Sequence, residues 1–187
     1  MATDYKVLGQ LASTVSSLSI TNKELTNNVA ILTLSAPHSI GVGQQVSVVL
    51  DTADSAFDGI RTVTAATSST LSFASNASNV ASAAATGTLN AFEHSTLYTC
   101  PASTAAVVST LTICNRSNTA AYYTIALTDS NSGEPAVSKY IVKNDVISGF
   151  ETVALTIGMT LDATNKYLRV SASNPNLTFA LFGSEIS

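Results

Sequence analysis

The sequence predicts an all-β protein, an antiparallel β-sandwich with a second, small β domain inserted near its N-terminus. Short runs rich in Val, Ile, Leu, Thr and Tyr recur between clusters of Asn, Asp, Gly, Ser and Pro, which is typical of strands and turns. No segment combines an apolar stripe of helical period with a helix cap. Only 11% of the residues are charged while 45% are hydrophobic, and Ser and Thr, which suit exposed strand faces, replace the missing charge.

The inserted domain is predicted to span residues 21–91. Its expected strands are residues 29–33, 46–50, 60–65, 70–74 and 87–89. Pro37 ends the first of these strands, because a proline cannot donate a hydrogen bond to a strand ladder. Residues 76–90, rich in Ala and Ser, are interpreted as a low-complexity stretch that ends in the last of these strands.

The sandwich domain is predicted to consist of residues 1–20 and 92–187. Its expected strands are residues 5–10, 95–100, 105–115, 122–129, 138–145, 150–157, 166–173 and 177–184. Simple alternation along 105–115 places Val107 and Ser109 on the face of Leu111, and Val108 on the opposite face with Cys114. Because the strand at 5–10 is separated from the others, we expect residues 21–91 to interrupt a jelly-roll or Ig-like sandwich at an exposed loop.

Charge and hydropathy exclude several classes of partner. The net charge is −4 and the chain has no cluster of Lys and Arg, so no nucleic-acid partner is expected. The first residues lack the basic and apolar regions of a signal peptide, and no apolar run approaches the length of a membrane span. We therefore expect a protein that folds in a cytoplasm and has no membrane partner.

Two groups of residues are candidates for a metal site. His38 and His94 lie far apart without Glu or Cys at metal-ligand spacing, so His38 is interpreted as a turn histidine that bonds local backbone. Asp51, Asp54 and Asp58 are close enough in sequence for a Ca²⁺ loop. Their spacing differs from known calcium loops and turns prefer Asp, so an ordinary acidic turn is expected.

No pattern of residues predicts an enzyme. The chain has neither G-x-S-x-G nor S-x-x-K, no glycine-rich phosphate loop, and no histidine placed in sequence to activate Cys114. No catalytic residue, cofactor or metal is therefore expected. Cys100 and Cys114 are interpreted as buried thiols, with a Cys100–Cys114 disulfide as the alternative if their strands are neighbours.

Two sets of segments resemble known phage proteins. YKVLGQ, STLYTCPASTAAVVSTLTICNR and LTFALFGSEI resemble segments of small virion structural proteins of tailed bacteriophages, especially marine and cyanobacterial phages. NVAILTLSAPHSIGVGQQVSVVL and FDGIRTVTA resemble an Ig-like module that decorates many phage surface and tail proteins. The resemblance implies a β fold and a place in the virion, and it carries no catalytic residue.

The resemblance and the neutral surface together lead to a functional expectation. We expect a capsid decoration (cement) protein that assembles onto the virion in the host cytoplasm, contacts the major capsid protein or tail proteins, and forms a homo-oligomer such as a trimer. The alternatives are a tail, neck or fibre component, or a host-surface or glycan-binding module. The expected contact residues are Tyr5, Lys6, Arg116 and Phe182.

Overall fold

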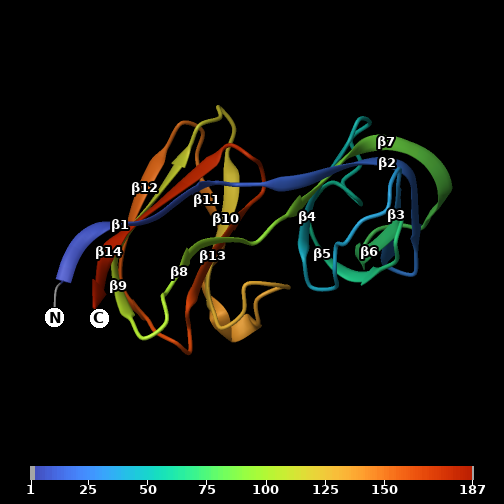
Figure 1. The fold of residues 1–187 in the computed structure, drawn as a ribbon. Coiled ribbons are helices and arrows are strands. Elements are labelled where there is room, and N and C mark those ends of the chain that lie inside the picture. Colours follow the sequence, from blue (N-terminus) through green and yellow to red (C-terminus); the bar gives the residue numbers. More distant parts are fainter. Residues whose placement is uncertain (1–2, 187) are drawn as a thin grey trace. The chain divides into compact units, whose positions relative to one another are not determined.

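The structure is all-β, as predicted. A computed structural model describes residues 3–186, and within this range it contains strands, turns and one short 3₁₀ helix, η1 (Val137–Lys139) (Figure 1). Every strand pairing is antiparallel. No helix of the described range is long and apolar enough to cross a membrane.

The chain divides into two compact units. The first comprises Met1–Thr14 and Glu93–Ser187, and the second comprises Val15–Phe92. The first boundary lies earlier than the predicted one at residue 20, because Val15–Ile20 pair with Gly87–Phe92 and so belong with the second unit.

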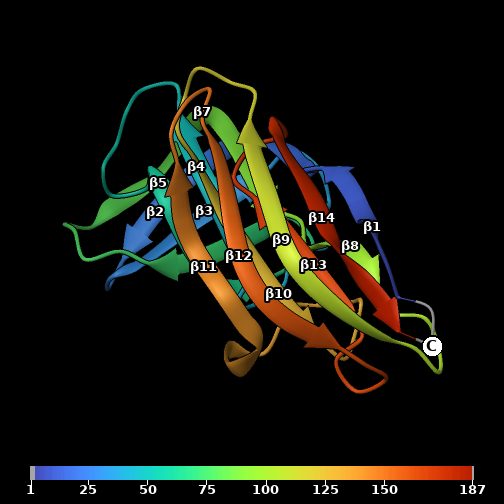
Figure 2. The same cartoon turned by 90° about the vertical axis from the view of Figure 1, so that its left-hand side faces the viewer.

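Two four-stranded sheets make up the first unit. One has the order β1 (Thr3–Ala12), β14 (Leu177–Ile186), β9 (Ala105–Asn115) and β12 (Thr152–Leu161). The other has the order β11 (Tyr140–Ile147), β10 (Ala121–Thr128), β13 (Tyr167–Ala172) and β8 (Ser95–Thr99). Figure 2 shows the strands of the first sheet side by side. Buried side chains from both sheets form one apolar core, among them Leu111, Phe179, Tyr123 and Val170.

A bulge in β9 overturns the predicted face assignment. Phe182 of β14 pairs with Thr110, but the next residue, Gly183, pairs with Val108, so Ser109 is an extra residue in β9. An extra residue reverses the alternation of side chains beyond it. Val108 is consequently buried on the core face with Leu111, whereas Val107 is 37% exposed. The sequence-based placement of Val107 on the face of Leu111, with Val108 on the opposite face, was therefore wrong.

The second unit is a closed six-stranded barrel. Its strands, in order around the barrel, are β2 (Val15–Thr26), β3 (Val29–Leu34), β6 (Thr70–Ala74), β5 (Gly59–Ala66), β4 (Gln45–Leu50) and β7 (Val80–Phe92). Alternate apolar residues of the strands point inward and form a second core, which includes Leu25, Leu32, Val48 and Phe73. Phe57, from the loop between β4 and β5, also belongs to this core. Because β2 and β7 also pair with each other, the six strands form a closed sheet without a free edge.

Two barrel strands differ from the sequence prediction. β2 was not predicted, and β7 extends over the Ala/Ser-rich stretch that was interpreted as low complexity. Lys23 and Leu25 of β2 pair with Ala83 and Val80 of β7, so the two strands satisfy each other's backbone groups. Strand pairing thus overrides the low β propensity of alanine.

Candidate interaction surface

Two glycines lock the terminal strands of the first unit into close backbone contact. A Cβ atom on Gly9 would lie 2.1 Å from the carbonyl oxygen of Leu97, and one on Gly183 would lie 2.1 Å from that of Val107. Both distances are impossible for real atoms, so only glycine fits at these positions. These are the glycines of KVLGQ and LFGSEI: Gly9 lets β1 approach β8, and Gly183 lets β14 approach β9. The two segments themselves pair as part of β1 and β14.

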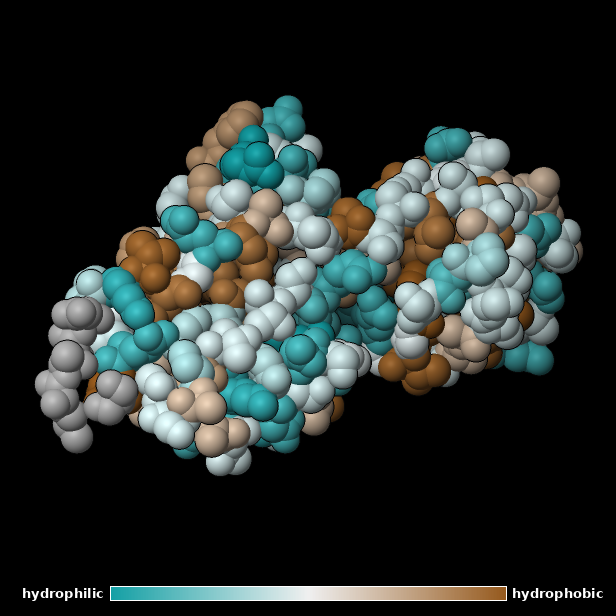
Figure 3. All heavy atoms as spheres, viewed as in Figure 1, coloured by the Kyte–Doolittle hydropathy of each residue, from teal (hydrophilic) through white to brown (hydrophobic). Residues whose placement is uncertain are grey.

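Paired in this way, the two segments expose an apolar patch on the outer face of their sheet. We call the side chains of Tyr5, Val7, Val107 and Phe182 the Tyr5–Phe182 patch. Val7 pairs with Phe182, while Tyr5 and Val107 both pair with Ser184, so all four side chains share one face. Tyr5 is 65% exposed and Val7 48%. Figure 3 shows hydrophobic side chains at the surface over β1 and β12.

Lys6, a predicted contact residue, forms an ion pair within the chain. Its Nζ lies 2.5 Å from Glu185 Oε2, and the hydroxyl of Tyr98 donates to Glu185 Oε1 at 2.8 Å. The hydrogen bond from Lys6 is the main reason why the pKa of Glu185 lies below its ordinary value. Lys6 and Glu185 therefore neutralise each other on the face of the sheet opposite the Tyr5–Phe182 patch.

Arg116, another predicted contact residue, lies elsewhere on the first unit. It follows the last residue of β9, Asn115, whereas the patch includes Val107 near the first. At about 3.3 Å per residue, Val107 and Asn115 are roughly 26 Å apart along the strand. The Arg116 side chain is exposed and donates to the carbonyl of Pro175 at 3.2 Å. The structure thus groups Tyr5 and Phe182 and leaves Arg116 outside the patch.

A buried polar cluster lies on the opposite sheet, and sequence analysis did not predict it. Arg169 of β13 is 3% exposed and donates to the carbonyl oxygens of Ser132 (3.3 Å), Gly133 (2.9 Å) and His94 (3.1 Å). The Nε2 of His94 lies 3.3 Å from Glu134, which also accepts a hydrogen bond from the hydroxyl of Tyr140. We call His94, Glu134, Tyr140 and Arg169 the Arg169 cluster.

The Arg169 cluster fastens the segment between β10 and η1 onto its sheet. Arg169 pairs with Ala126 on the side of the sheet away from the apolar core. Its bonds to two carbonyl groups of the segment explain why polar Thr124 and Thr128 of β10 are also buried. The sequence signal for this cluster is a single arginine inside the apolar strand YLRVSA, since its partners are scattered along the chain.

Protonation should loosen this cluster. Burial opposes the ionisation of Glu134, but hydrogen bonds from His94 and Tyr140 outweigh it and hold the pKa of the carboxyl below its ordinary 4.5. A lowered folded-state pKa stabilises the fold above the unfolded pKa and ceases to do so as the pH falls through the folded value. We expect Glu134→Gln to destabilise the protein at pH near 7 and to differ little from wild type near pH 3, in urea unfolding at each pH. An equal difference at both pH values would contradict this assignment.

The acidic loop of the second unit is a structural turn. Asp58 accepts backbone N–H bonds from Leu50 and Asp54, both at 2.7 Å, and Asp54 pairs with Lys23 at 2.7 Å. Asp51 is exposed. Over the described residues, no group of three or more His, Cys, Asp and Glu side chains is placed to hold a metal ion.

His38 and the two cysteines also have local structural partners. The Nδ1 of His38 accepts the backbone N–H of Ile40 at 3.2 Å, as expected of a turn histidine. Cys100 and Cys114 are free thiols, so the alternative of a disulfide between them is not realised. Cys100 is buried and its Sγ donates to the carbonyl of Thr104, and burial raises its pKa.

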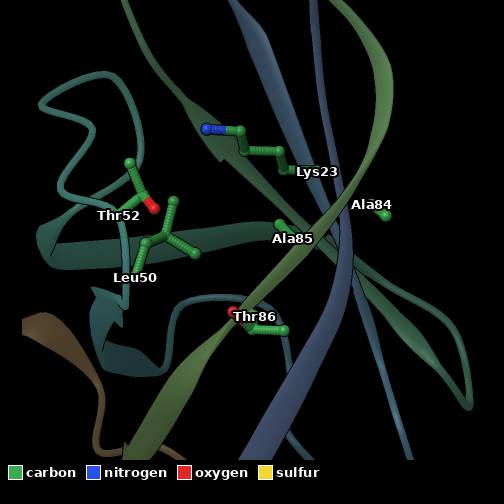
Figure 4. A pocket seen from close by; sticks show the side chains of 6 residues that line it. All are labelled: Lys23, Leu50, Thr52, Ala84, Ala85 and Thr86. Atoms are coloured by element: carbon green, nitrogen blue, oxygen red, sulfur yellow. The ribbon is translucent and has the colours of Figure 1, made fainter.

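Two hollows mark the surface of the units. One, of about 340 Å³, lies on the outer face of the β1–β14–β9–β12 sheet, over small side chains that include Thr112, Cys114 and Thr178. The other, of about 210 Å³, lies on the barrel and is lined by Lys23, Leu50, Thr52, Ala84, Ala85 and Thr86 (Figure 4). Lys23 is the charged group of the barrel hollow, and Asp54 neutralises it. Neither hollow brings together an acid, a base and a nucleophile.

No model of a known protein family and no curated protein matches the sequence.

Proposed function

We propose that this protein is a non-enzymatic structural component of a tailed-phage virion, and that it decorates the capsid surface. The observation that carries the proposal is the Tyr5–Phe182 patch. It is built by β1 and β14, the strands that contain KVLGQ and LFGSEI, and these segments resemble phage virion proteins. The segments of the resemblance thus form one continuous exposed apolar surface.

The chemistry of this surface favours a protein partner that is itself uncharged. Lys6 and Glu185 neutralise each other on the opposite face of the sheet, and next to the patch the sheet presents Thr110, Thr112 and Ala180. Such a face offers apolar area and hydroxyl groups but no net charge, which suits the outer surface of a major capsid protein. A decoration protein binds the capsid through many modest contacts of this kind. Once one contact has formed, the effective concentration of the protein at the next contact site is raised.

We further propose a domain arrangement for this function. The first unit is a β-sandwich of the jelly-roll or Ig-like type, whose two sheets enclose the core that includes Leu111 and Val170. The second unit is a domain inserted between β1 and β8 of that sandwich. The sandwich attaches to the virion, and the inserted domain is the part that varies between relatives, since its sequence resembles a module found on many phage proteins.

The patch can be tested by binding to particles. The binding partner is a virion produced by a phage that lacks the gene for this protein. We expect the double variant Tyr5→Ser, Val7→Ser to bind such virions about tenfold more weakly than the wild type, or weaker still, because both side chains lose apolar contact area. Co-sedimentation of purified protein with such virions measures this. Val137→Ser is the control, because Val137 is 87% exposed and lies outside the patch.

Two results of this experiment would contradict the proposal. One is equal binding by the double variant and the wild type, which would show that the patch is not the attachment surface. The other is a failure of the wild-type protein to bind virions that lack this protein, which would contradict the virion role itself.

A further inference from the structure

The first unit has four sheet edges, and three of them carry features that prevent pairing with another strand. β1 carries Lys6 and is shifted in register between Val7 and Gly9. β11 carries Lys143, and its Asn144 has a positive φ of 55°. β8 is only five residues long. Charges, bulges and short length are the usual means by which natural proteins block unwanted edge-to-edge pairing.

The fourth edge, β12, lacks this protection over its first half. From Thr152 to Leu161 it contains no charged residue and no proline. Residues 152–156 pair with 114–110 of β9 without a register shift, and within the described residues no strand pairs with their other side. A regular, uncharged edge of this kind can accept another strand through its free N–H and C=O groups.

The side chains of β12 are also incompletely covered. Val153 and Leu155 point to the apolar core and pack against it, yet each is only partly buried. On the outer face, Thr152, Ala154 and Thr156 are exposed. One further strand beside β12 would cover the aliphatic row on one face and extend the hydroxyl-bearing row on the other.

We propose that β12 pairs antiparallel with β12 of a second copy of this chain, about a two-fold axis through Ala154. Thr152 then faces Thr156 of the other copy and Val153 faces Leu155, so hydroxyls meet hydroxyls and aliphatic side chains meet aliphatic side chains. The two four-stranded sheets become one continuous eight-stranded sheet.

The absence of charge identifies a second copy as the occupant. Two-fold pairing sets identical strands against each other, so a charged strand meets its own charges at close range, which is unfavourable. β12 avoids this in every register, whereas self-pairing of β1 or β11 in a register centred near Lys6 or Lys143 would bring two lysines together. β1, which carries the Tyr5–Phe182 patch, is the opposite edge of the same sheet, so the dimer keeps two patches free.

The oligomeric state of the full chain tests this pairing. We expect the wild type to sediment as a dimer at concentrations of about 100 µM, since short edge pairings bind in the micromolar range. Ala154→Lys should weaken the dimer by about tenfold or more, because it sets two ammonium groups opposite each other at the axis. Ala154 is exposed, so the substitution leaves the fold intact.

Two variants with opposite charges at position 154 provide the strongest test of this pairing. A mixture of Ala154→Lys and Ala154→Glu chains should recover the dimer, since opposite charges then face each other. Val146→Lys, on the exposed face of β11, is the control and should dimerise like the wild type. A monomeric wild type, a dimer insensitive to Ala154→Lys, or a mixture that stays monomeric would each overturn the proposal. None of these outcomes depends on the virion role, which the particle-binding experiment tests separately.

Discussion

Gly183→Ala should lower the free energy of unfolding of the first unit by about 3 kcal/mol or more, the largest effect expected of a single added methyl group here. The new Cβ would lie 2.1 Å from the carbonyl oxygen of Val107 and 2.9 Å from the side chain of Leu8. The Val107 carbonyl belongs to the backbone of the adjacent strand, so relief requires β14 and β9 to separate. At this size the melting temperature falls by about 12 °C or more.

Tyrosine fluorescence is a selective probe for this measurement. The chain has six tyrosines and no tryptophan, and all six tyrosines lie in the first unit. Their signal therefore reports unfolding of that unit and not of the barrel. Val137→Ser is the control, because Val137 lies in the same unit and its side chain is 87% exposed. A Gly183→Ala protein that unfolds at the same urea concentration as Val137→Ser would contradict the close-contact explanation.

Arg169→Met should destabilise the first unit by about 3 kcal/mol, the second large effect. Methionine replaces much of the volume but donates no hydrogen bond, so the carbonyl groups of Ser132, Gly133 and His94 lose their guanidinium partner. The positive charge near the Glu134 carboxylate is lost as well. Leaving buried acceptors unsatisfied costs more than the net value of the hydrogen bonds themselves.

Two measurements distinguish this local role from a general loss of packing. Urea unfolding followed by tyrosine fluorescence gives the stability, and limited trypsin digestion reports whether Lys139, beside the fastened segment, becomes accessible. Arg116→Met is the control, since Arg116 is exposed and should change stability by no more than about 0.5 kcal/mol. If Arg169→Met and Arg116→Met behave alike in both measurements, the cluster does not fasten the segment.

The fold class was predictable because alternation of side chains is a local property. β4 and β6 follow the expected pattern, with Val46, Val48, Leu71 and Phe73 buried. β2 was not predictable in this way, because half of the residues in Val15–Ile20 are serine and the segment is ordered by pairing with β7. Such a strand is defined by a partner far away in sequence, and no local pattern reports it.

Strand register and buried polar clusters were the other features that could not be predicted from the sequence. The extra residue at Ser109 reverses the faces of Val107 and Val108, but nothing in VVSTLT marks where a bulge falls. The Arg169 cluster joins residues that are far apart in sequence. Of the predicted contact residues, Tyr5 and Phe182 meet because β1 and β14 pair, which the alternation of either strand alone does not reveal.

The two surfaces proposed for the first unit use opposite edges of one sheet. β1 and β14 present the Tyr5–Phe182 patch, while β12 presents a bare edge to a second copy. A dimer would therefore carry two attachment patches, and two-point attachment strengthens binding to a repetitive lattice without any new contact.

The most direct test of the proposed virion role is the number of copies of this protein in purified particles of a phage that carries its gene. Quantitative gel staining or mass spectrometry against the major capsid protein gives this number. Capsid decoration predicts hundreds of copies per particle, as does a tail tube or sheath, and a few to tens would instead indicate the neck, baseplate or a fibre. Absence of the protein from purified particles would contradict the account.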